Sequence, residues 1–111
     1  MFVLIAQFDS GGEAAGEPPV GSAEAVRLLG DQPDTRALRW ARSTEDPGRW
    51  LLVAEFETAA GFRRAQSPLP VRAALIPWLA AAASSAAFEV IAAADAGVWS
   101  SPEVIVDDPG R

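Results

Sequence analysis

The residue types in this 111-residue chain limit the chemistry that it can perform. It has no cysteine, histidine or tyrosine, and all nine basic residues are arginines, so the usual thiolate, general base, zinc ligand and Schiff-base former are missing. A buried carboxylate can still take a proton from a substrate. Glu55 and Glu89, which we expect on neighbouring strands, are therefore candidates for base and acid. The alternative is surface pairing with Arg36, Arg39 or Arg63.

Composition excludes several classes of partner. Half of the residues are hydrophobic, 22% are charged and the net charge is −6, as expected for a folded single domain. The arginines are scattered, so we expect neither nucleic-acid binding nor attraction to a membrane surface. The longest uncharged run, between Arg72 and Glu89, contains Pro77 and is mostly alanine, short of the roughly 20 apolar residues of a spanning helix. We expect a cytoplasmic protein.

Short apolar or alternating runs predict four strands. The run 2–8 is apolar throughout and should be central, whereas 35–42 carries alternating arginines and should lie at a sheet edge. The turn 43–49 joins that edge strand to 50–57 in a hairpin. The segment 87–93 is the fourth predicted strand, although alanine is a weak strand former.

Two helical regions separate these strands. Ser22 is a candidate N-cap for a helix over 23–30, which follows a loop rich in glycine and proline. Thr58 can cap the next helix, which a serine- and proline-rich segment interrupts. Over 71–82 apolar residues then recur at helical spacing, with Pro77 as a kink or a restart.

The order strand, helix, strand, strand, helix, strand predicts a ferredoxin-like α+β fold. Such a βαββαβ chain forms a four-stranded antiparallel sheet with its helices on one face. We expect large apolar side chains from all four strands on the other face, and hence a homodimer that packs two sheets into a dimeric α+β barrel. Residues 1–94 form the predicted domain. Residues 95–111 form a tail in which 104–106 adds an edge strand or which is otherwise disordered.

Several motifs resemble the antibiotic biosynthesis monooxygenase family, small dimeric α+β barrels common in actinobacteria. They are the Arg-Ser-x-x-Asp-Pro turn over 42–47, the strand end Glu55-Phe56, the Ser-Pro-x-x-Val-Arg helix opening over 67–72, and the Phe-Glu-Val strand over 88–90. The likeness covers residues 2–94. It implies a dimer with a small-molecule cleft between the helices and the sheet of each subunit.

The resemblance also implies a range of reactions. The family includes oxygenases that convert polycyclic phenols or anthrones to quinones with molecular oxygen and without metal or flavin, and others that degrade haem. Without histidine and asparagine this chain lacks the haem ligand and polar partner typical of the haem-degrading branch. It also lacks the tyrosine and asparagine that quinone-forming relatives place beside the substrate. Its first helix is shortened behind Pro18-Pro19, which changes the mouth of the cleft.

Oxygenation without a cofactor needs a cleft that excludes water, a group that stabilises the substrate anion, and room for dioxygen. Within the implied cleft, tryptophans would form the walls and an arginine would stabilise the anion, with no metal or cofactor. Alternatively, each tryptophan is simply an anchor of the core or the dimer interface. The candidate catalytic residues are Trp78, Arg72 and Glu55. The candidate substrate-binding residues are Trp40, Trp50, Phe62, Leu75 and Arg39, with Arg42 as a further anion stabiliser.

The leading hypothesis is a cofactor-independent monooxygenase that acts on an aromatic polyketide or a similar hydrophobic phenol. A second hypothesis is a non-catalytic dimer that binds a hydrophobic small molecule or assists a biosynthetic enzyme, which the missing histidine, tyrosine and asparagine favour. A third is a lactone isomerase or cyclase on the same scaffold. It would require Glu55 or Glu89 to be buried in the cleft.

Overall fold

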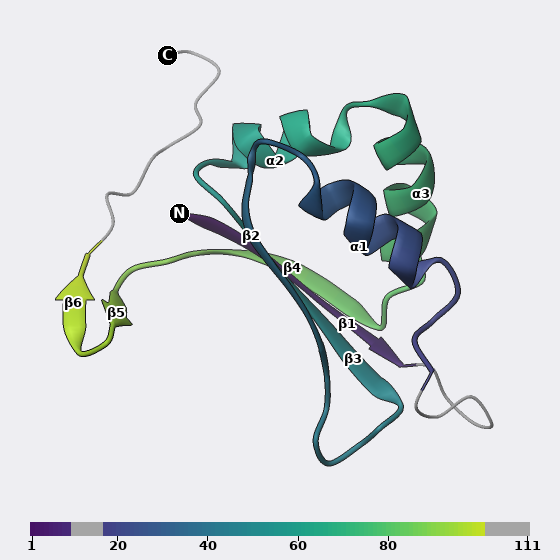
Figure 1. Ribbon diagram of the computed structural model, residues 1–111, viewed down its shortest axis with the longest axis horizontal. Helices are drawn as coiled ribbons and strands as arrows, with labels where there is room; N and C mark the ends of the chain where they lie inside the picture. Colours follow the sequence, from purple (N-terminus) through teal and green to yellow (C-terminus); the bar gives the residue numbers. More distant parts are fainter. Residues whose placement is uncertain (10–16, 102–111) are drawn as a thin grey trace.

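A computed structural model describes residues 1–9 and 17–101, and within them one sheet is covered by helices on a single face (Figure 1). The sheet is antiparallel, with strand order β2-β3-β1-β4. Its strands are β1 (Phe2–Asp9), β2 (Thr35–Arg42), β3 (Arg49–Phe56) and β4 (Ser84–Glu89). The helices are α1 (Ser22–Gly30), α2 (Ala59–Gln66) and α3 (Leu69–Ala80). The predicted ferredoxin-like α+β arrangement is therefore confirmed.

The register of the strands decides which side chains meet the helices. Leu4 of β1 lies opposite Ala54 of β3, which in turn lies opposite Leu38 of β2. Because side chains alternate between the two faces of a strand, the even-numbered residues of β1 and β3, and those of β2 from Leu38 onward, point toward the helices. There they form one core with Leu29 of α1 and Leu75 of α3.

The opposite face of the sheet, which we call the open face, carries apolar side chains without a covering layer from the described residues. The large ones come from β1, β3 and β4, and not from all four strands as predicted. β2 contributes Ala37, Arg39 and Ala41 to this face, since those residues pair with Glu55, Val53 and Leu51. The large apolar members are Val3, Ile5, Leu51, Val53 and Phe88.

Two side-chain caps were predicted for the helices, and one is confirmed. Thr58 Oγ1 accepts a hydrogen bond from the Gly61 backbone N–H at 3.0 Å and so caps α2. The prediction for Ser22 is wrong by one residue, because Gly21 is the N-cap of α1 and has a φ of 87°. Glycine adopts this left-handed conformation without steric cost. Ser22 is thereby the first residue of the helix, where its hydroxyl faces the core.

The β2–β3 hairpin is confirmed, and short polar contacts shape its turn. Ser43 Oγ accepts hydrogen bonds from the backbone N–H groups of Glu45 and Asp46, at 3.2 and 3.0 Å. Asp46 Oδ1 accepts a third from the Gly48 N–H at 3.1 Å. These contacts satisfy backbone donors that the strand ladder does not reach.

The C-terminal part departs from the sequence prediction. The last strand of the sheet begins at Ser84, three residues before the predicted 87–93, because pairing with β1 from Gln7 to Phe2 overrides the weak strand propensity of alanine. A separate hairpin of β5 (Ala93–Asp95) and β6 (Val98–Ser100) was not predicted. It spans the predicted domain boundary at residue 94, while 104–106 lie outside the described residues.

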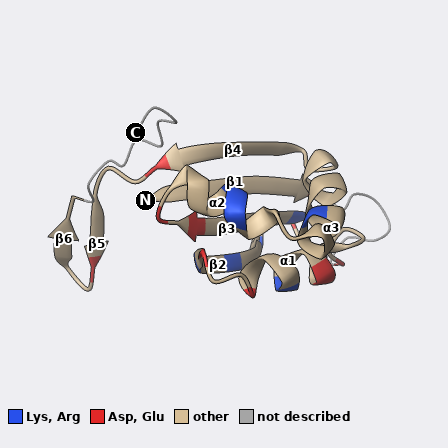
Figure 2. Cartoon of the chain, turned by 90° about the horizontal axis from the view of Figure 1, so that it is seen from above, with Lys and Arg blue, Asp and Glu red and all other residues tan. Residues whose placement is uncertain are grey.

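Charged residues gather on β2, β3 and the helices, whereas β1 and β4 carry charge only at their ends, at Asp9 and Glu89 (Figure 2). β1 is a central strand, for which few charges are typical, whereas β4 is an edge strand whose residues are exposed. None of the described helices is long and apolar enough to cross a membrane.

Replacing Ser22 tests the contact that joins α1 to α3. Ser22→Ala should lower the free energy of unfolding by about 1–3 kcal/mol, because it removes the acceptor 2.9 Å from the buried indole N–H of Trp78. Denaturant unfolding measures this change. Combining Ser22→Ala with Trp78→Phe should cost less than the sum of the single changes. Ser101→Ala, at an exposed serine, is the control; strict additivity of the pair would contradict the hydrogen bond.

Candidate functional site

Four aromatic rings from four elements form a continuous array at the Phe8 end of the core. Phe8 stacks on Trp78 with ring centroids 4.3 Å apart, and Trp78 lies 5.4 Å from Trp40. Trp40 stacks on Trp50 at 5.3 Å with an interplanar angle of 18°. We call Phe8, Trp78, Trp40 and Trp50 the tryptophan stack. Such an array offers large flat apolar surfaces for a ring-shaped ligand.

The tryptophan stack runs from the core toward the surface. Phe8 and Trp78 are only 1% and 5% exposed, and the Trp78 indole is fixed by its hydrogen bond to Ser22. Trp40 and Trp50 are half-buried, because β2 is the edge strand. Trp78 is thus a core residue, whereas the outer pair, Trp40 and Trp50, is the part that a ligand can approach.

The Trp50 indole has an unusual environment. Its Nε1 is buried, and it has no hydrogen-bond partner within the described part of the chain. The guanidinium carbon of Arg42 lies 5.8 Å from the centroid of the same ring, within cation–π range. A buried N–H without an acceptor is costly and rare, so it marks a place where a ligand oxygen would be favoured. Sequence reasoning proposed Trp50 and Arg42 separately but could not see this unpaired donor, which depends on packing.

Two predicted substrate-binding residues lie elsewhere in the core. Phe62 packs on Phe2 and Phe56, with centroids 5.6 and 5.1 Å apart, at the far end of β1 from the tryptophan stack. Leu75, on α3, is fully buried in the core. These two residues therefore stabilise the helix–sheet interface.

Apart from Arg42, the charged candidates are not brought to the tryptophan stack. Glu55 lies on the open face, where its carboxylate is 4.0 Å from Arg39, itself 74% exposed. Arg72 is exposed on α3. The geometry therefore does not place Glu55, Arg39 and Arg72 in one cleft with Trp78. The sheet and the helix backbone separate these three residues from that indole.

The expected adjacency of Glu55 and Glu89 is wrong. β1 lies between β3 and β4, so the two carboxylates are on strands that do not pair. They also point to opposite faces, because Glu89 shares a face with Phe2 while Glu55 shares one with Val3. Neither can serve the other as base and acid. No three metal-ligating side chains gather in the ranges 1–9 and 17–101.

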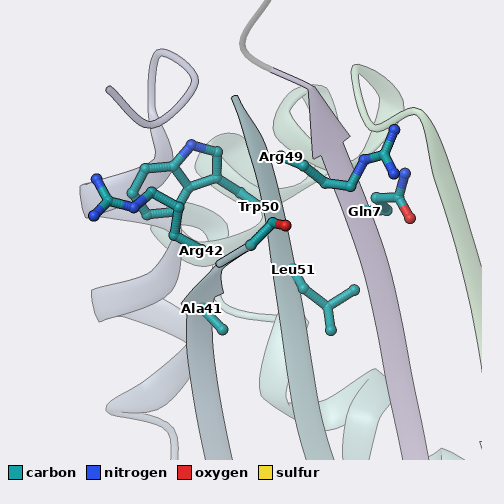
Figure 3. A pocket seen from close by; sticks show the side chains of 7 residues that line it. Gln7, Ala41, Arg42, Arg49, Trp50 and Leu51 are labelled. Atoms are coloured by element: carbon teal, nitrogen blue, oxygen red, sulfur yellow. The ribbon is translucent and has the colours of Figure 1, made fainter. Parts of the chain in front are cut away.

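The open face has a hollow of about 240 Å³ beneath the β2–β3 turn (Figure 3). Gln7, Leu51 and Arg49 project to one side of β3, whereas Trp50 and Arg42 project to the other. We call this space the hairpin hollow. Its lining residues are Gln7, Ala41, Arg42, Ser43, Arg49, Trp50 and Leu51.

A second hollow, of about 230 Å³, lies between the β2 start and α2. Its charged groups already pair with one another: Arg36 with Glu57 and Arg64 with Asp34, each at 3.0 Å. These pairs tie β2 to the segment before and within α2, so this hollow has a structural explanation.

No family model and no curated protein matches this chain. Solved structures do share its fold. A structure of an antibiotic biosynthesis monooxygenase is 19% identical, with a TM-score of 0.60 over 79% of this chain and 94% of that one. SnoaB, a cofactor-independent oxygenase from Streptomyces nogalater solved as a mutant, is 15% identical, with a TM-score of 0.60 over 96% and 97%. Rv0793 from Mycobacterium tuberculosis is 9% identical, with a TM-score of 0.63 over 79% and 92%. The motif resemblance to this family is therefore confirmed as a likeness of fold.

The burial of Trp78 predicts how its removal acts. Trp78→Ala should lower the free energy of unfolding by about 3–5 kcal/mol, because it leaves a cavity against Phe8 and Trp40. Ile76→Ala on the same helix, at a side chain that is 54% exposed, is the matched control and should change it by about 0.5 kcal/mol or less. If Trp78→Ala unfolded like the control, Trp78 would be a cleft wall and not a core residue.

Proposed function

We propose that this protein is a homodimeric member of the antibiotic biosynthesis monooxygenase family that oxidises a hydrophobic aromatic small molecule with dioxygen and without a bound cofactor. The fold likeness supports the family, and one neighbour is a cofactor-independent oxygenase that matches nearly the whole chain. The observation that carries the reaction is the buried, unpartnered N–H of Trp50 at the outer end of the tryptophan stack.

The ligand class follows from the outer pair of the stack. A planar phenol or anthrone presents apolar ring surface that packs against the exposed parts of the Trp40 and Trp50 indoles, whose ring faces are stacked on each other. Its phenolic oxygen accepts the hydrogen bond that Trp50 Nε1 lacks within the described residues. The Arg42 guanidinium beside that ring favours a ligand that becomes an anion.

The proposed reaction begins with loss of a proton from the substrate, which gives a delocalised anion. The anion transfers one electron to dioxygen, the resulting substrate radical and superoxide combine to form a C–O bond, and the peroxide takes up a proton. Cleavage of the O–O bond with loss of water then leaves a carbonyl, so that a CH₂ group and O₂ become C=O and H₂O. Trp50 and Arg42 stabilise the first anion, and the stack keeps water away from the radical pair.

The first proton goes to solvent in this scheme. Among the described residues, Trp78 donates its hydrogen bond to Ser22 and Trp50 Nε1 has no partner, so no carboxylate is bound to either indole. The chain also has no histidine or tyrosine to take the proton. The substrate must therefore be acidic enough to ionise with only hydrogen-bonding and electrostatic help, as polycyclic phenols and anthrones do.

The open face supports the homodimer. Ile5, Leu51 and Val53, which are half-buried, and Phe88, which is 52% exposed, form an apolar surface around the buried Val3, and apolar patches of this kind mark interaction sites. A second copy offers the same surface, so a two-fold contact buries both at once.

Two alternatives differ in their support. A non-catalytic dimer that binds the same ligand is favoured by the missing histidine, tyrosine and asparagine, and it would use the same outer pair of tryptophans. A lactone isomerase or cyclase needs a carboxylate in the cleft. Glu55 lies on the open face and Glu89 at the exposed end of β4, so this alternative loses its base.

Oxygen uptake with an anthrone tests the proposed reaction. Wild type should consume oxygen above the uncatalysed background, and Trp50→Phe should lower kcat/KM by about 100-fold, because it keeps the ring and removes the donor. Ile76→Ala, at a side chain that is 54% exposed on α3, is the control and should keep full activity.

No uptake by wild type, together with quenching of tryptophan fluorescence by the anthrone, would leave the non-catalytic binder as the function. Uptake that Trp50→Phe does not slow would contradict the role of the indole donor. Denaturant unfolding of Trp50→Phe controls for loss of the fold.

A further inference from the structure

The β5–β6 hairpin stands away from the rest of the molecule (Figure 1). Within the described residues, β5 and β6 pair as strands only with each other, through Asp95–Val98, Ala94–Trp99 and Ala93–Ser100. Its largest apolar side chains, Val98 and Trp99, are 71% and 74% exposed. An isolated two-stranded hairpin is marginally stable in water, so this one needs a surface to pack against.

The turn of the β5–β6 hairpin is a second reason to expect a surface that packs against it. Ala96 and Gly97 have φ values of 51° and 84°, as in the two-residue turns whose twist matches that of the strands. The left-handed conformation is easy for glycine and unfavourable for alanine. A conformation with such a cost persists where contacts elsewhere hold it. Trp99 is the side chain best placed to supply them.

The hairpin hollow fits one large side chain. Its volume of about 240 Å³ lies below the roughly 300–1,000 Å³ of clefts that hold drug-sized ligands. Ala41 and Leu51 supply apolar walls from the open face. The side-chain amide of Gln7 can accept a hydrogen bond from an indole N–H, and the guanidinium of Arg49 can lie over an indole ring.

The β5–β6 hairpin and the hairpin hollow lie at opposite ends of the sheet of one chain (Figure 1). β4 ends at Glu89, opposite Phe2, and leads from there to β5, whereas the hollow includes Gln7, near the other end of β1. At about 3.3 Å per residue, Phe2 and Gln7 are roughly 17 Å apart along the strand, and the hairpin points further away. Each chain therefore presents the β5–β6 hairpin beyond one end of its sheet and the hairpin hollow at the other end.

We propose that Trp99 of each chain docks into the hairpin hollow of a second copy, so that two chains exchange their C-terminal arms. The inference rests on the proposed dimer and specifies how its two open faces are oriented. A two-fold axis that lies between the sheets and crosses the strands reverses strand direction. With this axis, the Phe2 end of β1 in one chain lies over the Phe8 end of β1 in the other. Each C-terminal arm then reaches the hairpin hollow of the other chain.

Docking would also connect assembly to the proposed ligand site. The hollow shares the backbone of Arg42 and Trp50, whose side chains lie on the other face of the same hairpin (Figure 3). A partner's Trp99 seated against this backbone restricts the motion of the strand pair that carries the Trp50 donor. The partner therefore acts as a positioning element for the outer end of the tryptophan stack.

Cross-linking tests the exchange directly, because the chain has no cysteine of its own. Ser100→Cys combined with Ala41→Cys should give, with a short bis-maleimide, a product of twice the chain mass on a denaturing gel. Each single variant, and the pair Ser100→Cys with Ile76→Cys on the exposed side of α3, should give little of it. A cross-link within one chain would overturn the exchange, since Trp99 would then serve its own hollow.

Sedimentation of Trp99→Ala separates this inference from the dimer itself. The dimer dissociation constant should rise by about 30-fold or more, because each dimer loses two docked tryptophan side chains, while Ile76→Ala leaves it unchanged. A monomeric wild type would overturn both the dimer and the exchange. A dimer that Trp99→Ala does not weaken, with no cross-link, would overturn the exchange alone and leave the hollow to a small ligand.

Discussion

The covering of only one face of the sheet by helices is the constraint on which the rest of the structure depends. On the covered face, the even-numbered residues of β1 and β3, and those of β2 from Leu38 onward, are packed against α1, α2 and α3, and the core is closed there. On the open face, Val3, Ile5, Leu51, Val53 and Phe88 meet no layer from the described residues. The proposed ligand site and the proposed assembly surface thus lie on opposite sides of one sheet.

The tryptophan stack stabilises the core at its inner end and, in the proposed function, binds the ligand at its outer end. Its inner end, Phe8 and Trp78, is buried and is held to α1 through Ser22. Its outer end, Trp40 and Trp50, rests on that fixed base, so the indoles are oriented before a ligand arrives. A rigid aromatic wall lowers the entropy lost on binding, and the cost of the unpaired Trp50 donor is recovered when a ligand oxygen accepts its hydrogen bond.

Much of the fold was predictable because local signals agreed with one another. The alternation in 35–42 and 50–57 and the turn between them define the β2–β3 hairpin, and Thr58 caps α2 as its position suggests. The start of β4 was not predictable, because Ser84 to Ala87 have little strand propensity and join the sheet only through pairing with β1. The N-cap moved to Gly21, because the Ser22 hydroxyl has a tertiary partner 56 residues away.

The residue types of the candidate site were predictable from the sequence, but their arrangement in space was not. Trp40, Trp50 and Trp78 were chosen as candidate walls, and tertiary packing brings them into one row. Glu55, Arg39 and Arg72 were chosen on charge, which does not reveal the face on which a side chain lies relative to a cleft. The strand order that separates Glu55 from Glu89 follows from pairing over the whole sheet, which no local pattern encodes.

Sedimentation equilibrium of the unmodified protein, over a range of concentrations, tests the central claim that the open face is covered by a second copy. The account predicts a single species of twice the chain mass of 11.6 kDa. A stable monomer of 11.6 kDa would contradict it, because the apolar open face would then be exposed to water or covered by the chain's own residues.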